Sequence, residues 1–230
     1  MILGRGLACG RCESCSLHFF SVGCLPRPLS VGLLDPVFSD FADEFPNAEV
    51  IGTDVTPIQR SWVPPNVKFE LDDCNKEWTW PNNTFDFVNL RYLIGVVDDW
   101  DALFRNAYRV AKPGAYVESL VPGSYFLSDD GTVKEGSSLD QWGRVFREGG
   151  KRIGRTFSIL EEDLQRKGME AAGFVDIEFK DFRCPMGTWP SDKEEAEKAL
   201  WQKFAVEADL EGKLACDHSV SLPCLMSIEP

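Results

Sequence analysis

The pattern of hydrophobic and polar positions changes character twice along the chain. Residues 1–36 follow neither a helical nor a strand period and are rich in Cys, Gly, Ser and Pro. Over residues 37–190, short apolar runs alternate with amphipathic stretches, whereas residues 191–230 combine one charged helical pattern with an irregular tail. These changes predict a central domain over residues 37–190, preceded by an irregular segment and followed by a helix and an irregular tail.

The central zone alternates predicted strands with predicted helices. Apolar runs at residues 48–53, 67–71, 85–90 and 115–120 predict buried strands, and an apolar–polar alternation at 175–179 predicts another. Apolar residues at helical spacing predict helices over residues 37–45, 100–111, 160–171 and 196–204. Strands separated by helices predict an α/β fold: a Rossmann-like, mostly parallel sheet with helices on both faces.

Composition narrows the function classes. The 230 residues carry a formal net charge of −13, which argues against direct nucleic-acid binding because phosphate contacts need clustered Lys and Arg. No run of eighteen apolar residues and no secretory signal pattern is present, so neither a membrane span nor secretion is expected. The eight cysteines are unevenly distributed, unlike a secreted disulfide framework. We therefore expect a cytoplasmic or nuclear protein.

Acidic residues follow two of the predicted strands at the point where each strand ends. Asp54 follows the first apolar run, and Asp72 and Asp73 follow the second. Ligands of parallel sheets bind beyond these carboxyl ends, where an Asp can accept hydrogen bonds from both ribose hydroxyls. Asp73, followed by Cys74, suits the adenine amino group, with Asp72 as the fallback. The alternative is that these aspartates are loop residues, helix caps or solvated turns.

Several segments together resemble one family. FADEFPNAEVIGTD at residues 41–54, SWVPPNVKFELDD at 61–73, FDFVNLRYL at 85–93 and AYRVAKPGAYVE at 107–118 are similar to fungal methyltransferases related to the velvet-complex secondary-metabolism regulators. Shorter matches extend to residue 190, so that the resemblance covers about 150 of 230 residues in the family's order. The chain is thus identified as resembling a class I S-adenosylmethionine-dependent methyltransferase.

The resemblance implies a cofactor and a set of binding residues. The cofactor would be S-adenosylmethionine, with Asp54 on its ribose and Asp73 with Cys74 on its adenine. Asn89, Arg91 and Tyr92 would lie where the cofactor's methyl group meets the acceptor.

For two of these residues a structural role is the alternative. Arg91 would then pair with a surface carboxylate, and Tyr92 would be a core residue. No catalytic residue is assigned, since methyl transfer from a sulfonium depends mainly on positioning and a water-poor site.

The glycine loop of the family is missing. The family carries three alternating glycines before its first helix, and at the family's spacing these positions fall on Val31, Leu33 and Asp35. Side chains there would crowd the cofactor, because glycines let backbone N–H groups approach it closely. We therefore expect an incomplete first strand and loop, with residues 1–36 unrelated to the family. A shifted reading frame or wrong exon junction is one explanation, and divergence into a non-catalytic member is the other.

Three functions follow from these observations. The first is a methyltransferase acting on an unknown small-molecule or protein acceptor, and the second is an inactive methyltransferase-fold protein that binds a regulatory partner. A nicotinamide oxidoreductase is the third, but it needs the same missing glycines. Lys112-Pro113-Gly114, before the strand predicted at residues 115–120, also suits methyltransferases better.

A cluster of cysteines near the start of the chain raises the question of a metal. Cys9, Cys12 and Cys15 stand at three-residue spacing, with His18 and Cys24 beyond them. Structural zinc sites usually present two separated cysteine pairs on turns. Because the second pair is missing, we expect no metal site.

Overall fold

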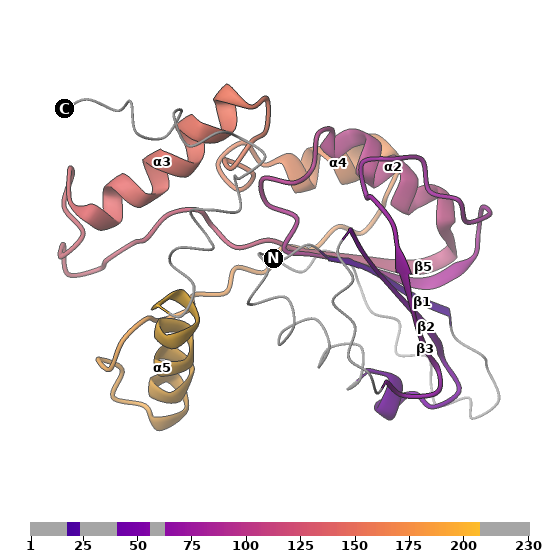
Figure 1. The fold of residues 1–230 in the computed structure, drawn as a ribbon, viewed down its shortest axis with the longest axis horizontal. Helices are drawn as coiled ribbons and strands as arrows, with labels where there is room; N and C mark the ends of the chain where they lie inside the picture. Colours follow the sequence, from indigo (N-terminus) through magenta and orange to yellow (C-terminus); the bar gives the residue numbers. More distant parts are fainter. Residues whose placement is uncertain (1–17, 24–40, 56–62, 208–230) are drawn as a thin grey trace.

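A five-stranded parallel sheet forms the centre of the protein (Figure 1). The computed structural model describes residues 18–23, 41–55 and 63–207. The strand order across the sheet is β3-β2-β1-β4-β5. The strands are β1 (His18–Gly23), β2 (Glu49–Asp54), β3 (Val67–Leu71), β4 (Phe85–Arg91) and β5 (Ala111–Leu120). The prediction of an α/β fold with a parallel sheet is confirmed.

The central strand comes from a part of the chain where no regular element was predicted. We expected residues 1–36 to be irregular, but β1 lies in this range and pairs with β2 on one side and β4 on the other. Its sequence, HFFSVG, contains the aromatic and β-branched residues that favour strands, yet its short apolar run is flanked by Cys, Gly and Pro. This strand lies before the position that the family's spacing gives for the glycine loop.

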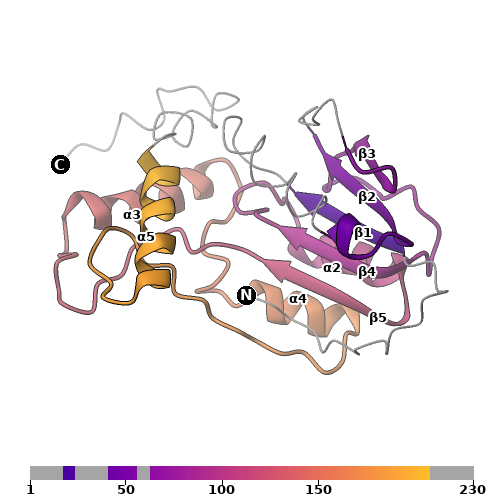
Figure 2. The ribbon, with the colours of Figure 1, turned by 90° about the horizontal axis from the view of Figure 1, so that it is seen from below.

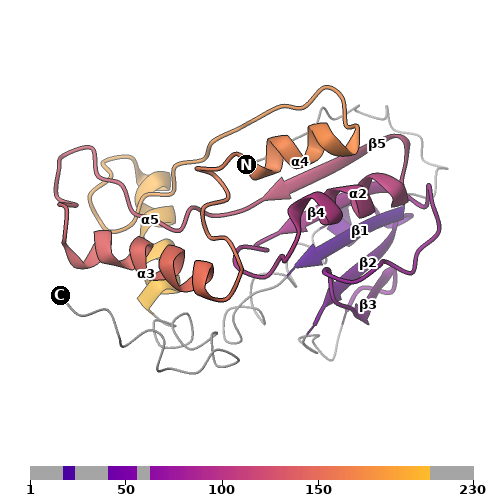
Figure 3. The ribbon, with the colours of Figure 1, turned by 90° about the horizontal axis from the view of Figure 1, so that it is seen from above.

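One face of the sheet is covered by two helices that pack on each other. Helices α2 (Trp100–Val110) and α4 (Leu164–Ala172) lie together on this face (Figures 1 and 3). The side chain of Asp99 caps the first turn of α2 by accepting a hydrogen bond from the Ala102 N–H. The largest fully buried side chains lie mainly here: Phe85, Leu90, Leu93, Leu103, Phe104, Ile159 and Met169.

A smaller apolar layer covers the opposite face of the sheet. A helical turn at residues 41–44 places Ala42 beside the buried Val50 and Val67, and the Phe41 ring stacks on Phe87 with 6.3 Å between centroids. The Asn66 side chain holds this turn by donating to three backbone carbonyls, those of Ala42, Phe45 and Ala48. Apolar residues therefore cover the sheet on both faces, as parallel sheets require.

The strand predicted at residues 175–179 does not form. Asp176 has a φ of 53°, which breaks the extended backbone, and Val175 is 81% exposed. Ile177 and Phe179 still pack against the core, so the alternation reflects burial of one side of an irregular segment. A strand needs a hydrogen-bonded partner, and within the described residues the sheet ends at β5.

Two further helices lie beyond the carboxyl ends of the strands. Helix α3 (Ser138–Arg152) was not predicted, whereas α5 (Lys193–Glu207) extends the helix predicted at residues 196–204. Figures 2 and 3 show both away from the sheet, on the side toward which the strands point. Helix α5 leaves three large apolar side chains exposed: Leu200, Trp201 and Phe204. Among the described helices, none has the length and apolar character that crossing a membrane would need.

A glycine sets the distance between α2 and α4. A Cβ atom on Gly168 would lie 2.5 Å from Cδ2 of Phe104, a fully buried ring. We predict that Gly168→Ala lowers the free energy of unfolding by about 1–3 kcal/mol, because overpacking outweighs the helix-propensity gain of about 1 kcal/mol. Urea titration checks this, with the exposed Glu170→Ala on the same helix as control, expected within about 0.5 kcal/mol of wild type. A Gly168→Ala variant more stable than wild type would contradict the tight packing.

Candidate functional site

The carboxyl ends of the strands meet at one edge of the sheet. Gly23 lies opposite Arg91 in the register of β1 and β4, and Val22 lies opposite Thr53, so Asp54 and Arg91 end their strands at the same level. One strand separates them, a span of roughly 10 Å at the usual spacing. The order of the strands reverses between β1 and β4. Open α/β sheets bind their ligands at this switch point.

Asp54 lies at this edge with little exposure to solvent. Its residue is 8% exposed, and its carbonyl accepts a hydrogen bond of 3.2 Å from the Asp72 N–H. That bond joins the end of β2 to the turn that follows β3. The structure thus brings together the acidic residues that the sequence placed after two separate strands.

The turn after β3 is organised by its own carboxylates. Asp72 Oδ1 accepts from the Asp73 N–H at 2.8 Å, and Asp73 Oδ1 accepts from the Asn75 N–H at 3.0 Å. Lys76 Nζ lies 3.7 Å from the other oxygen of Asp73. Asp73 therefore does organise a turn, as the alternative interpretation of this residue expects. Both aspartates are half-buried and stay close to Asp54.

Cys74 faces the core beside this turn. Its residue is 8% exposed, and its carbonyl accepts a hydrogen bond of 3.4 Å from the Trp78 indole. Burial, with the Asp73 carboxylate as a smaller cause, raises the pKa of the Cys74 thiol to about 12. The thiol is therefore neutral at physiological pH and serves as an apolar wall, not as a nucleophile.

Three polar residues form a cluster on β4 and β5. The Arg91 guanidinium lies 3.5 Å from Glu118 on the neighbouring strand and donates to Asn89 Oδ1 at 3.3 Å. Asn89 is 2% exposed, and the Glu118 side chain is 16% exposed. Arg91 thus has the carboxylate partner of the structural alternative, but within the sheet and not on the surface. The cluster lies on the same face as Phe87.

Tyr92 has an unusual backbone. It directly follows β4 and has a φ of 55°, in the left-handed region of the backbone that residues other than Gly, Asn and Asp rarely adopt. Its N–H donates to the Leu120 carbonyl at 3.0 Å, which holds the conformation. Strained residues of this kind cluster at functional sites, and this one lies at the switch point.

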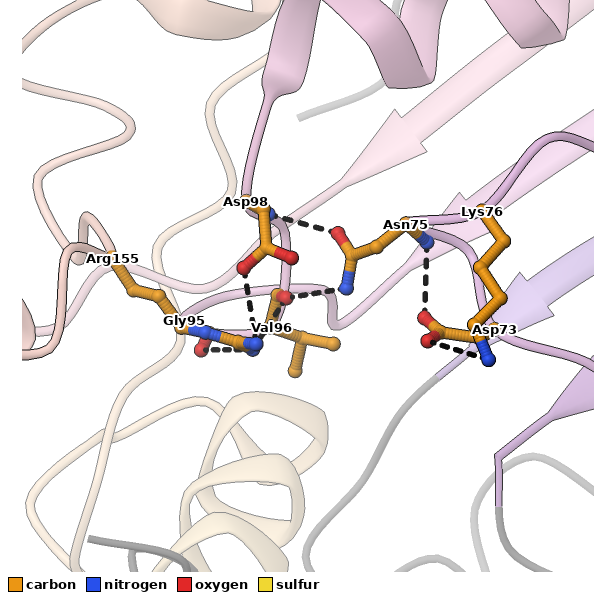
Figure 4. A network of polar contacts seen from close by, with 7 residues as sticks. All are labelled: Asp73, Asn75, Lys76, Gly95, Val96, Asp98 and Arg155. Atoms are coloured by element: carbon orange, nitrogen blue, oxygen red, sulfur yellow. Dashed lines mark hydrogen bonds and ion pairs between the residues drawn. The ribbon is translucent and has the colours of Figure 1, made fainter.

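Sequence reasoning missed the residues that hold the loops in place. Asn75 and Arg155 both bind the loop after β4 (Figure 4). Arg109, in the last turn of α2, donates to the carbonyls of Trp78 and Trp80 at 2.7 Å each. Asn75 had a local signal, since Asn commonly organises turns, but nothing in the pattern distinguishes Arg155 or Arg109 from surface arginines.

Other residues singled out from the sequence lie outside the described part of the chain. They are the glycine-equivalent positions Val31, Leu33 and Asp35 and the cysteines Cys9, Cys12, Cys15 and Cys24. Over residues 41–55 and 63–207, no group of three or more His, Cys, Asp or Glu side chains is arranged to hold a metal ion.

Comparison with known proteins assigns the chain to a family. A family model described as a methyltransferase domain matches residues 31–178. The chain belongs to this methyltransferase-domain family. A secondary metabolism regulator of Cochliobolus heterostrophus is 32% identical over 189 residues, which are 81% of this chain and 61% of the relative. A methyltransferase of Aspergillus terreus is 34% identical over 143 residues, 62% of this chain and 43% of the relative.

These relatives confirm the resemblance to the fungal secondary-metabolism regulators. The chain spans about half the length of the curated relatives it matches, from 43% to 61%. A solved structure agrees on the fold. The phosphoethanolamine N-methyltransferase 2 of Haemonchus contortus, in complex with S-adenosyl-L-methionine, has a TM-score of 0.50 at 21% identity, covering 92% of this chain and 43% of that protein.

The raised pKa of Cys74 leads to a chemical test. At pH 8, a pKa of about 12 leaves roughly one thiolate in ten thousand, and burial also blocks access. We predict that iodoacetamide leaves Cys74 unmodified in the native protein and labels the exposed Cys184 much faster. Peptide mass spectrometry after a timed quench measures both sites. Equal labelling of the two would show that the Cys74 environment is open to solvent.

The left-handed backbone of Tyr92 predicts an inverted preference between two small residues. Tyr92→Gly and Tyr92→Ala both remove the ring, but only Ala keeps the clash of Cβ with the backbone. We expect the Gly variant to be more stable than the Ala variant by about 1 kcal/mol in urea unfolding. At Ser119, an extended position on β5, the Ala variant should instead be more stable than the Gly variant. An Ala variant at position 92 as stable as the Gly variant would argue against the strain.

Proposed function

We propose that the protein transfers a methyl group from S-adenosylmethionine to an acceptor that is a small molecule or a protein. The observation that carries the proposal is that Asp54 and the Asp72–Asp73 turn lie together at the carboxyl edge of a parallel sheet, in a chain of the methyltransferase-domain family. The relatives named as methyltransferases support the same chemistry.

The residues at the strand ends fit the nucleoside part of the cofactor. Asp54 offers a carboxylate, an acceptor-only group, where two ribose hydroxyls need acceptors. Asp73, with Asp72 as the fallback, offers an acceptor for the adenine amino group. Cys74 adds an apolar neighbour whose thiol stays neutral, which suits a flat aromatic base. Together these groups hold and orient the nucleoside.

The chemistry of transfer asks little of the protein. When bound, S-adenosylmethionine supplies a methyl group on a sulfonium, whose thioether is a good leaving group. The protein's part is to hold the acceptor in line and to exclude water. The candidate acceptor face consists of Asn89, Arg91 and Tyr92, since the first two lie in the last part of β4 and Tyr92 follows it, beside the switch point. The loops at residues 122–136 and 184–190 would enclose the acceptor.

A second candidate is a methyltransferase-fold protein that binds a regulatory protein partner without turnover. The observation in its favour is the replacement of the three loop glycines by Val31, Leu33 and Asp35. Side chains at these positions would occupy the space of the cofactor's methionine part, and a carboxylate there would repel its carboxylate. Both candidates agree with a cytoplasmic or nuclear location, which is part of the proposal.

Calorimetry with S-adenosylmethionine tests the proposal. We expect saturable binding by the wild-type chain and an affinity about 10–100-fold lower for Asp54→Asn, because hydrogen bonds to a charged group are worth about 1.5–3 kcal/mol. Asp86→Asn is the matched control. It removes a carboxylate that pairs with Lys112 at 2.7 Å, at the amino end of β4, and should bind like wild type.

The same titration separates the two candidates. Absence of binding at millimolar cofactor would reject the methyltransferase function for this chain and leave the regulatory one. If Asp54→Asn binds S-adenosylmethionine as tightly as wild type, the cofactor does not bind at the end of β2, and that part of the proposal is wrong. Binding that Asp54→Asn weakens, without methylation of any acceptor, would favour the regulatory candidate with a retained cofactor.

A further inference from the structure

The loop after β4 is held on one side by Asn75, which lies in the turn after β3. Asn75 lies two residues after Asp73, and its side chain reaches across to this loop (Figure 4). Its Nδ2 donates to the Val96 carbonyl at 3.0 Å, and its Oδ1 accepts from the Asp98 N–H at 2.8 Å. The paired contacts resemble those of a strand edge, so they fix both the position and the orientation of the loop.

The same loop is held from the other side by an arginine. Arg155 follows α3, and its guanidinium donates to the carbonyls of Gly95 and Val96 and pairs with Asp98 Oδ1 at 3.0 Å. The Val96 carbonyl therefore accepts from Arg155 and from Asn75 at once. Asp98 is also shared, since Asn75 binds its N–H and Arg155 binds its carboxylate. Figure 4 shows Arg155 and Asn75 on opposite sides of residues 95–98.

The Phe157 ring also packs between α3 and this loop. The Phe157 ring lies so close to two glycines that a Cβ would be 2.2 Å from it at Gly95 and 2.5 Å from it at Gly150. Gly150 belongs to α3, and Gly95 has a φ of 72°. Only glycine gives the ring this access at Gly95. We call residues 138–157, which carry α3 and both Arg155 and Phe157, the α3 cap.

These contacts do more than add an ion pair to the surface. The Asp98 side chain is 59% exposed and the Arg155 side chain 32%, and a pair that exposed contributes little stability by itself. Hydrogen bonds to main-chain carbonyls are directional, however, and a planar guanidinium can satisfy two carbonyls and a carboxylate together. Their effect is to set the geometry of residues 95–98.

We propose that Arg155 and Asn75 are positioning residues that join the α3 cap to the Asp73–Cys74 turn through residues 95–98. The proposal rests on the proposed function, in which this turn binds the adenine. Loss of Arg155 would then loosen the loop, release Asn75 and disturb the turn that Asn75 anchors through its bond to Asp73. Cofactor binding would depend on a residue of the cap that does not touch the cofactor.

Calorimetry with S-adenosylhomocysteine tests this on the full chain. We expect Arg155→Met and Asn75→Ala each to weaken binding about 5–10-fold, the order of one or two lost hydrogen bonds. The double variant should lose clearly less than the product of the two, because both side chains act on the same carbonyl. Arg155→Lys, which keeps the charge beside Asp98 but not the planar fork, should recover only part of the affinity.

A matched control separates positioning from general stability. Arg147→Met removes another arginine of α3, 28% exposed and 3.7 Å from Glu161, outside the network. It should bind S-adenosylhomocysteine like wild type even where its thermal midpoint falls as far as that of Arg155→Met. Equal binding by wild type and Arg155→Met would overturn the proposal, as would multiplicative effects in the double variant.

Hydrogen exchange keeps the inference testable if the proposed function fails. Should the wild-type chain bind neither S-adenosylmethionine nor S-adenosylhomocysteine, the link is read from the amides of Asn75 and Asp98. Arg155→Met should speed exchange at both amides severalfold relative to Arg147→Met, since the N–H of Asp98 bonds to Asn75 and that of Asn75 bonds to Asp73. Unchanged protection at Asn75 would overturn the link between cap and turn.

Discussion

Parallel pairing on both sides of β1 is the constraint on which the rest of the structure depends. β1 donates and accepts main-chain hydrogen bonds with β2 and with β4, and these two strands lead to the two halves of the site. Because every strand runs in the same direction, Asp54, the Asp72–Asp73 turn and Arg91 end at one edge. If β1 were removed, the two halves would have no common frame, and the acidic turn would have no fixed relation to the candidate acceptor face.

The loops at that edge are ordered by side chains that bind the main chain. Irregular segments cannot satisfy their own carbonyls, so Asn75, Arg109 and Arg155 supply the donors that a strand neighbour would otherwise give. The same need accounts for the strain at Tyr92, whose N–H bonds to the end of β5 while its φ is positive. Rigid strands and loops held in this way would supply the positioning on which the proposed methyl transfer depends.

The sequence predicts this fold where burial alone decides the structure. The strands β2 to β4 and helix α2 have strong apolar patterns and were placed to within about two residues, the usual uncertainty of element ends. Prediction from the sequence fails where the pairing of strands decides the structure. β1 has a short and ordinary apolar pattern, and residues 175–179 alternate like a strand but have no neighbouring strand to pair with. For the site, an Asp at a strand end is a local signal, whereas the partnership of Arg155 with Gly95 joins residues sixty positions apart and leaves no local trace.

The position of β1 also has a consequence for the order in which the chain folds. Phe19 pairs with Phe87, so one edge of the central strand stays without its neighbour until the ribosome has released the whole of β4. Contacts between such distant positions form slowly, and an unpaired strand edge is where other chains attach. A nascent chain that already holds β1, β2 and β3 would therefore be the form that most needs a chaperone.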